Sequence, residues 1–369
     1  MNPIALCYGT RPQVIKASVL RKALGRCWPL VTVDTGQHYD FAMNQLLYQQ
    51  LEVAPPDHFL EVGSASHAVQ TATILMRMER LVHQLRPRAM VVIGDTNSTL
   101  GSALAACKSD IPVVHVEAGL RAIDARMPEE INRKLVDAIA TLLCAPSHSS
   151  AERLRRNRQD ATVVNTGDVA RDVLRLSEPN LPGLSALLPA GIAGGKYIYA
   201  TLHRAELTSD PMRLIAILET LGVLSLPVLL PLHPRTRAVL SDTGETRSRI
   251  GSLTIMEPVG YLESLALARA AALVVTDSGG IQREAYWLGV PCITIRTETE
   301  WLETVALGAN VLVSPHAVEG DLPKAVALQG DRWKNGRNWD REEYGDGRAG
   351  ERIVASIGEW LGAPVSRSA

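Results

Sequence analysis

Two spacings of apolar residues alternate along the chain. Short continuous runs, such as Ala89-Met-Val-Val-Ile93, are followed by longer segments in which apolar residues recur with the period of a helix. The first half is therefore expected to hold strands at 3–8, 29–34, 88–93, 112–116, 142–146 and 161–165, and helices at 12–25, 66–86, 96–108 and 129–140. Strands that alternate with helices predict a doubly wound α/β domain with a parallel sheet.

The second half repeats this pattern after a break in composition. Residues 177–195 hold three prolines and four glycines, which is typical of a linker. Further strands are expected at 197–201, 228–230, 253–256, 273–276 and 292–295. The predicted fold is α/β, with two Rossmann-like domains, 1–176 and 196–350, that face a cleft. Residues 351–369 begin with a helical pattern, and they are expected to end the second domain or to cross back to the first.

Composition and charge narrow the class of protein. The chain has 38 Lys and Arg against 39 Asp and Glu. This balance argues against a nucleic-acid partner, because proteins that bind nucleic acids carry an excess of basic residues. The five cysteines form no CxxC pair, and no apolar run reaches the roughly 18 residues that span a membrane. We expect a cytoplasmic protein with no membrane partner, no metal and no cofactor, since zinc-site and GxGxxG motifs are absent.

Two segments have the pattern of phosphate-binding turns. In Val274-Val-Thr-Asp-Ser-Gly-Gly-Ile-Gln-Arg-Glu284, a buried strand leads through Ser278, Gly279 and Gly280 into a helix whose free N–H groups suit a diphosphate. Glu284 lies one turn later, where its carboxylate suits ribose hydroxyls. A plain turn capped by Ser278 is the structural alternative.

The other segment is Gly9-Thr-Arg-Pro-Gln-Val-Ile-Lys16, which also follows a buried strand and opens a helix. Arg11 and Lys16 would place positive charge at the cleft mouth. It is not a Walker loop, because GxxxxGK[ST] is absent.

Acidic and histidine side chains follow other predicted strands. Asp95 closes the strand at 89–93, Glu117 and Arg121 follow 112–116, and Glu129 opens the next helix. A single acid at a helix start is usually a cap, but three at one cleft favour general acid and base chemistry. His203 and His233 follow strands of the second domain and are expected at the same cleft.

Taken in order, these motifs resemble the UDP-N-acetylglucosamine 2-epimerase family, in particular its non-hydrolysing branch. The resemblance covers nearly the whole chain through GTRPQVIK (9–16), TGQHYD (35–40), GDTNSTL (94–100), HVEAGLR (115–121), PEEINR (128–133), LHRAE (202–206), HPRT (233–236), EPVGYLE (257–263), TDSGGIQREA (276–285) and GERIV (350–354).

The resemblance implies the glycosyltransferase-B architecture, a homodimer and a UDP-sugar substrate. It implies epimerisation at C2 by elimination and re-addition of UDP through a 2-acetamidoglucal. By motif, the family's catalytic carboxylates match Asp95, Glu117 and Glu129, and its catalytic histidine matches His203. The groups that bind UDP-sugar match Arg11, Lys16, Ser278, Gly279, Gly280 and Glu284, and we place Arg121 and His233 in the same site.

Some positions depart from the family and leave alternatives open. Tyr39-Asp40 stands where many members have a basic residue that binds an activating substrate molecule, and Leu207 replaces an asparagine. The segment Arg296-Thr-Glu-Thr-Glu-Trp301 also differs from the commoner form. The alternatives are a UDP-2,3-diacetamido-2,3-dideoxy-glucuronate 2-epimerase, a hydrolysing epimerase and a glycosyltransferase of the same architecture.

Overall fold

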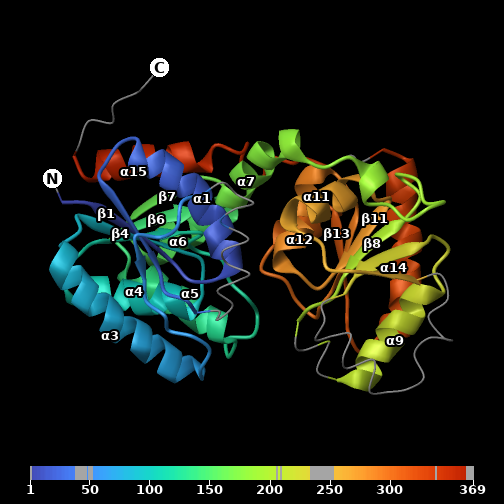
Figure 1. The fold of residues 1–369 in the computed structure, drawn as a ribbon, viewed down its shortest axis with the longest axis horizontal. Helices are drawn as coiled ribbons and strands as arrows, with labels where there is room; N and C mark the ends of the chain where they lie inside the picture. Colours follow the sequence, from blue (N-terminus) through green and yellow to red (C-terminus); the bar gives the residue numbers. More distant parts are fainter. Residues whose placement is uncertain are drawn as a thin grey trace. The chain divides into compact units, whose positions relative to one another are not determined.

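The chain folds into two α/β units, each built on a parallel sheet. The computed structural model describes residues 2–37, 48, 53–204, 207, 210–232, 253–336 and 339–362. The first unit comprises Met1–Arg175 and Glu342–Ala369, and the second comprises Leu176–Arg341. Figure 1 labels the helices and strands of both units. The predicted α/β class with two doubly wound domains is confirmed.

The first unit has a seven-stranded sheet in the order β3-β2-β1-β4-β5-β6-β7. Its strands are β1 (Ile4–Tyr8), β2 (Leu30–Asp34), β3 (His58–Phe59), β4 (Ala89–Ile93), β5 (Val113–Val116), β6 (Leu142–Ala145) and β7 (Thr162–Asn165). Its helices are α1 (Arg11–Gly25), α3 (His67–Leu85), α4 (Asn97–Lys108), α5 (Pro128–Ile139), α6 (His148–Asn157), α7 (Val169–Ser177) and α15 (Ala349–Trp360).

The second unit has a six-stranded sheet in the order β10-β9-β8-β11-β12-β13. Its strands are β8 (Ile198–Thr201), β9 (Val228–Pro231), β10 (Leu253–Met256), β11 (Leu273–Thr276), β12 (Cys292–Ile295) and β13 (Asn310–Val313). Its helices are α9 (Pro211–Gly222), α11 (Tyr261–Ala270), α12 (Gly279–Leu288), α13 (Leu302–Ala306) and α14 (Val318–Lys334). The short helical turns η1 (Glu178–Asn180) and η2 (Leu184–Ala186) lie in the segment predicted as a linker.

Central strands of the first sheet are apolar throughout because both of their faces are covered. In β1, Ile4 and Leu6 join one apolar cluster, whereas Ala5 and Cys7 join another. Successive strand residues point to opposite faces, so the two clusters lie on the two sides of the sheet. Helices α1 and α15 supply the first cluster, and α3, α4 and α5 supply the second. Figure 1 shows these two sets of helices flanking the strands.

The predicted strands are confirmed to within a residue or two at each end, but two short ones were not predicted. β3 is a two-residue edge strand, too short to show any period. β13 begins with Asn310, a buried polar residue that interrupts the apolar pattern by which a strand is predicted from sequence. Both lie at a sheet edge, where an assignment depends on a neighbouring strand.

Strand order creates a switch point in each sheet. β1 lies between β2 and β4, and β8 lies between β9 and β11, so the chain reverses its direction of travel across the sheet there. Ligands of open α/β sheets bind outside the carboxyl ends of strands at such points. The loops that follow β1 and β4 begin with Gly9 and Gly94, and those after β8 and β11 begin with Leu202 and Asp277.

Candidate active site

The turn after β1 is held by the side chain of Gln13. Its Oε1 accepts hydrogen bonds from the N–H groups of Gly9 (2.9 Å) and Thr10 (3.2 Å), which caps α1. Its Nε2 donates to the carbonyl oxygen of Ile93 at 2.6 Å. One amide therefore ties the loop after β1 to the end of β4. A Cβ at Gly9 would lie 1.9 Å from Thr35 Oγ1, so only glycine fits there.

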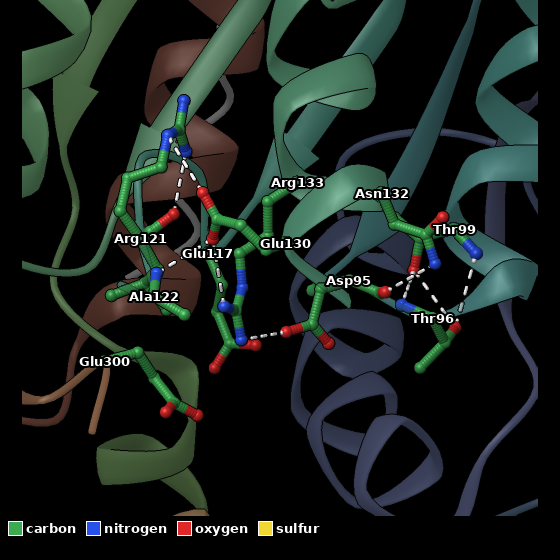
Figure 2. Close-up of polar contacts among 12 residues, drawn as sticks. Asp95, Thr96, Thr99, Glu117, Arg121, Ala122, Glu130, Asn132, Arg133 and Glu300 are labelled. Carbon is green, nitrogen blue, oxygen red and sulfur yellow. Dashed lines mark hydrogen bonds and ion pairs between the residues drawn. The ribbon is translucent and has the colours of Figure 1, made fainter. Parts of the chain in front are cut away.

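Asp95 lies just beyond β4 and pairs with a cation from α5. Arg133 Nη2 lies 2.5 Å from Asp95 Oδ2, and the Arg133 side chain is only 5% exposed. Asn132 donates to the backbone carbonyl of Asp95 at 2.9 Å. Figure 2 shows Asp95 and Arg133 pointing toward one another, with Asn132 beside the same turn. The backbone and the carboxylate of Asp95 are thus both held by α5.

Glu117 follows β5 in a strained conformation. Its φ is 66°, a left-handed value that costs a side-chain-bearing residue about 1–3 kcal/mol. Its Oε2 accepts a 2.6 Å hydrogen bond from Lys16 Nζ, and both side chains are nearly buried. A Cβ at Gly94 would lie 3.3 Å from the same oxygen, which places the Glu117 carboxylate against the turn that carries Asp95. Strain and a buried ion pair at one residue are typical of functional sites.

Glu130 supports this cluster from the first turn of α5. Its carboxylate is buried, accepts the N–H of Ala122 at 2.8 Å, and lies 3.3 Å from Arg133 Nη1. Arg133 therefore lies between two carboxylates, those of Asp95 and Glu130. A guanidinium with fixed donors suits this bridging task better than a lysine.

In the second unit, Asp277 organises the loops after β8 and β11. Its Oδ2 accepts hydrogen bonds from the N–H groups of His203 (2.9 Å) and Arg204 (2.8 Å). Its Oδ1 lies 2.9 Å from His203 Nδ1, although the ring N–H is not aligned with it well enough for a full hydrogen bond. Asp277 is fully buried, whereas the His203 side chain is 55% exposed. The carboxylate thus holds one edge of a ring that otherwise faces solvent.

Charges around Asp277 favour its ionised form. Burial by itself raises the pKa of a carboxyl group, but the contact with His203 and the two backbone N–H donors outweigh it, so the pKa of Asp277 lies below its ordinary value. A carboxylate beside Nδ1 orients the imidazole ring of a histidine. The buried carboxylate of Asp277 therefore orients the exposed edge of the His203 ring.

The start of α12 has the geometry expected of an anion site. Ser278 is the N-cap, and its Oγ accepts the N–H of Ile281 at 3.3 Å. Gly279 and Gly280 form the first turn, where N–H groups lack helical partners. A Cβ at Gly280 would meet only Ser278 Oγ, at 3.6 Å, so the backbone there is open to a ligand. Glu284 lies one turn along and is partly exposed.

The segment Arg296–Trp301 packs against this helix. Trp301 is buried, and the guanidinium of Arg283 lies 4.0 Å from its ring centroid. Thr299 Oγ1 donates to Gln282 Oε1 at 2.9 Å, which ties the segment to α12. Leu207, another of the three departures from the family pattern, is buried in the apolar core of the second unit.

The remaining predicted residues have different surroundings. Arg11 is exposed at the start of α1, and Glu129 is partly exposed in the first turn of α5; neither forms an ion pair with the described part of the chain. Arg121 Nη1 donates to Asp137 Oδ2 at 2.7 Å. His233 and the segment Tyr39-Asp40 lie outside the described residues. The roles of all the predicted site residues remain predictions.

Sequence reasoning did not select four residues that the structure brings into these clusters: His115, Glu130, Arg133 and Asp277. The sequence holds a signal for two of them, His115 and Asp277. His115 is a polar residue inside the apolar run Val113–Val116, and such a residue needs a buried partner. Asp277 directly precedes the Ser-Gly-Gly turn. Within the described ranges, no group of three or more His, Cys, Asp or Glu side chains could hold a metal ion, and no helix is long and apolar enough to cross a membrane.

Comparison with known proteins assigns this arrangement to a family. Residues 26–358 match the sequence profile described as UDP-N-acetylglucosamine 2-epimerase. The chain is 41% identical over 357 residues to the UDP-2,3-diacetamido-2,3-dideoxy-D-glucuronate 2-epimerase of Pseudomonas aeruginosa, and the match covers 94% of this chain and 96% of that protein.

Solved structures agree with the sequence match. The UDP-GlcNAc 2-epimerase of Methanocaldococcus jannaschii in complex with UDP-GlcNAc and UDP has a TM-score of 0.84 and 37% identity, over 97% of this chain and 99% of that one. The UDP-GlcNAc 2-epimerase of Neisseria meningitidis bound to UDP-GlcNAc has a TM-score of 0.83 and 26% identity, over 97% and 100%. This chain is therefore a member of the UDP-N-acetylglucosamine 2-epimerase family.

Proposed function

We propose that the protein interconverts UDP-N-acetylglucosamine and UDP-N-acetylmannosamine without releasing the free sugar. Relatives with this activity in their names match nearly the whole chain, including one at 37% identity. The observation that carries the proposal is the pairing of Asp95 with Arg133 and of Glu117 with Lys16 at neighbouring strand ends. These pairs give the first unit two carboxylates in defined positions.

The proposed reaction needs acid and base groups, and no net oxidation or reduction. A carboxylate removes the proton from C2 of the sugar, and the electron pair of that C–H bond forms the C1=C2 double bond. The C1–O bond breaks, and its electrons leave with the β-phosphate of UDP. A proton is then added to C2 from the opposite face, and UDP oxygen re-forms the bond to C1. Opposite faces require two groups, which suits a cluster of carboxylates.

The proposed roles are those that the family resemblance assigns to each residue. Asp95, Glu117 and Glu129 are the proposed acid and base groups. His203, oriented by Asp277, is the proposed proton-transfer group of the second unit. The N–H groups of Gly279 and Gly280 and the cap Ser278 suit the diphosphate, and Glu284 suits the ribose. Arg11, Lys16, Arg121 and His233 are the further proposed contacts to UDP-sugar.

Proton NMR in heavy water tests this proposal directly. Purified protein incubated with UDP-N-acetylglucosamine should yield the manno epimer, still attached to UDP, with deuterium at C2. Deuterium appears because the proton that returns to C2 comes from solvent-exchanged groups. Free N-acetylmannosamine together with UDP would instead identify a hydrolysing enzyme, and transfer of the sugar to an acceptor would identify a glycosyltransferase.

A second substrate is favoured by a specific comparison. The relative from Pseudomonas aeruginosa, 41% identical, is named for UDP-2,3-diacetamido-2,3-dideoxy-D-glucuronate. This sugar has the same C2 amide and the same leaving group, so the same acid and base residues would serve. The same heavy-water experiment with this donor decides between them: a much larger kcat/KM for the uronate would make it the substrate.

We also propose that the protein acts as a cytoplasmic homodimer. Exposed apolar side chains occur on two helices of the first unit, at Val69 and Met76 of α3 and at Ile131 and Leu135 of α5. Within each helix the two side chains are seven or four positions apart and so lie on one face, an arrangement found at subunit interfaces. Light scattering should give twice the mass of the 40.0 kDa chain. A monomer mass at the concentrations of the activity assay would contradict the dimer.

A further inference from the structure

A buried histidine lies beneath the two proposed catalytic turns. His115 is in β5 and is fully buried. Its Nδ1 lies 2.8 Å from Asp137 Oδ1, and its Nε2 lies 2.8 Å from the carbonyl oxygen of Gly94. Gly94 precedes Asp95, and His115 is two residues before Glu117. One imidazole ring therefore joins the two turns that carry these carboxylates.

Both partners of this ring accept hydrogen bonds. A backbone carbonyl has no proton to give, so Nε2 must donate. Asp137 also accepts from Gly119 N–H at 3.1 Å and from Arg121 Nη1 at 2.7 Å, as an ionised carboxylate does. Burial would raise the pKa of Asp137, but His115 and Arg121 outweigh that effect and lower it. Nδ1 must then donate as well, and a ring that donates from both nitrogens is an imidazolium.

The charges of the surrounding cluster agree with this assignment. The ion-paired acidic side chains near the two turns are Asp95, Glu117, Glu130 and Asp137, and their buried or partly buried cationic partners are Lys16, Arg121 and Arg133. A cationic His115 supplies the fourth positive charge for four carboxylates. Two further cations do not change this balance: Lys134, near Glu130, is half exposed and therefore solvated, and Arg158, whose charge also acts on Asp137, is paired with Asp160. Buried carboxylates left without a matching charge are costly.

We propose that His115 and Asp137 form a buried imidazolium–carboxylate pair that positions the turns carrying Asp95 and Glu117, and that this pair determines the rate of the chemical step. The inference rests on the proposed epimerase function. His115 is a positioning residue, because it is fully buried and acts through the backbone of Gly94 and through Asp137. Asp137 also accepts the N–H of Gly119, and this hydrogen bond restrains the backbone just after Glu117.

The charge state is tested by NMR on the unmodified protein. With ¹⁵N-labelled histidine, one residue should show, at neutral pH, protons on both ring nitrogens that exchange slowly with water. These signals should vanish in His115→Gln and persist in His83→Gln, a matched change at an exposed histidine of α3. A single ring proton on His115 at neutral pH would overturn the proposal, whatever the activity of the protein.

The positioning role is tested by two substitutions that each keep one hydrogen bond. The amide nitrogen of asparagine stands near the place of Nδ1, so His115→Asn retains the donor to Asp137. The amide nitrogen of glutamine stands near the place of Nε2, so His115→Gln retains the donor to Gly94. Each should lower kcat by about 10-fold to about 100-fold, since small displacements of reacting groups have effects of this size. KM and UDP affinity should change little, and His83→Gln should match the unmodified enzyme.

Asp137→Asn provides the remaining comparison. It should lower kcat as the His115 changes do, and combining it with His115→Gln should add little more, because both remove the same pair. Unchanged kcat in both His115 variants would overturn the positioning role, and so would fully additive losses. If the unmodified protein turns over no UDP-sugar, the proposed function fails instead, and the NMR result still decides the state of His115.

Discussion

At the residue scale, the structure adds supporting side chains to the residues that the motifs single out. The sequence identifies Asp95, Glu117 and His203 as candidate site residues because each is an ionisable residue that follows an apolar strand. Their partners Arg133, Lys16 and Asp277 come from other elements, so only the folded chain pairs them. For Lys16, the motif predicts a contact to UDP-sugar. It does not indicate the pairing with Glu117, whose carboxylate lies 2.6 Å from Lys16 Nζ in the structure.

Asp277→Asn tests the pairing in the second unit. The asparagine oxygen can still accept the N–H groups of His203 and Arg204, but its amide nitrogen would then face Nδ1 and favour the wrong tautomer of His203. We expect kcat to fall by about 100-fold or more, in line with the contribution of general acid–base groups. UDP affinity measured by calorimetry should change little.

The control for this prediction is Asp321→Asn, which removes an exposed carboxylate of α14 in the same unit. It should leave kcat and stability unchanged, because surface ion pairs contribute little. If Asp277→Asn were as active as this control, Asp277 would have no part in orienting His203.

At the element scale, apolar runs identify buried strands well, but contacts between distant segments cannot be read from them. The N-terminus of α15 shows this. Asp172 of α7 accepts hydrogen bonds from the N–H groups of Ala349 and Gly350, each at 2.8 Å. This cap joins residues more than 170 positions apart. Burial raises the pKa of Asp172 in spite of these two donors. No local pattern near residue 349 predicts an aspartate at 172.

Asp172→Ala should loosen α15 without unfolding the second unit. Loss of a capping side chain costs about 1 kcal/mol, and here it leaves two buried N–H groups unpaired. Hydrogen exchange followed by mass spectrometry should show faster exchange within 349–360.

Asp210→Ala is the matched change in the second unit, because Asp210 caps α9 through Met212 and Arg213 N–H. It should speed exchange within 211–222 and leave α15 protected. Faster exchange over the whole chain in either variant would show that the cap stabilises more than its own helix.

At the scale of the whole molecule, strand order decides which motifs meet. β1 and β4 are neighbours in the first sheet although α1, β2, β3 and α3 separate them in sequence. The same holds for β8 and β11 in the second sheet. Each pair forms a switch point, so the turns at Gly9 and Gly94 lie together in one unit, and those at His203 and Asp277 in the other. The chain also returns to the first unit at Glu342, where α15 packs on α1.

The sequence by itself determined the fold class, nearly all the strands and the family. These depend on local features: runs of apolar residues that must be buried, and short motifs in a fixed order. Tertiary structure alone decided which charges pair, because ion pairs such as Glu117 with Lys16 join residues about a hundred positions apart. It also decided the state of His115. A histidine inside an apolar strand reveals only that it needs partners, and its charge depends on whether those partners donate or accept.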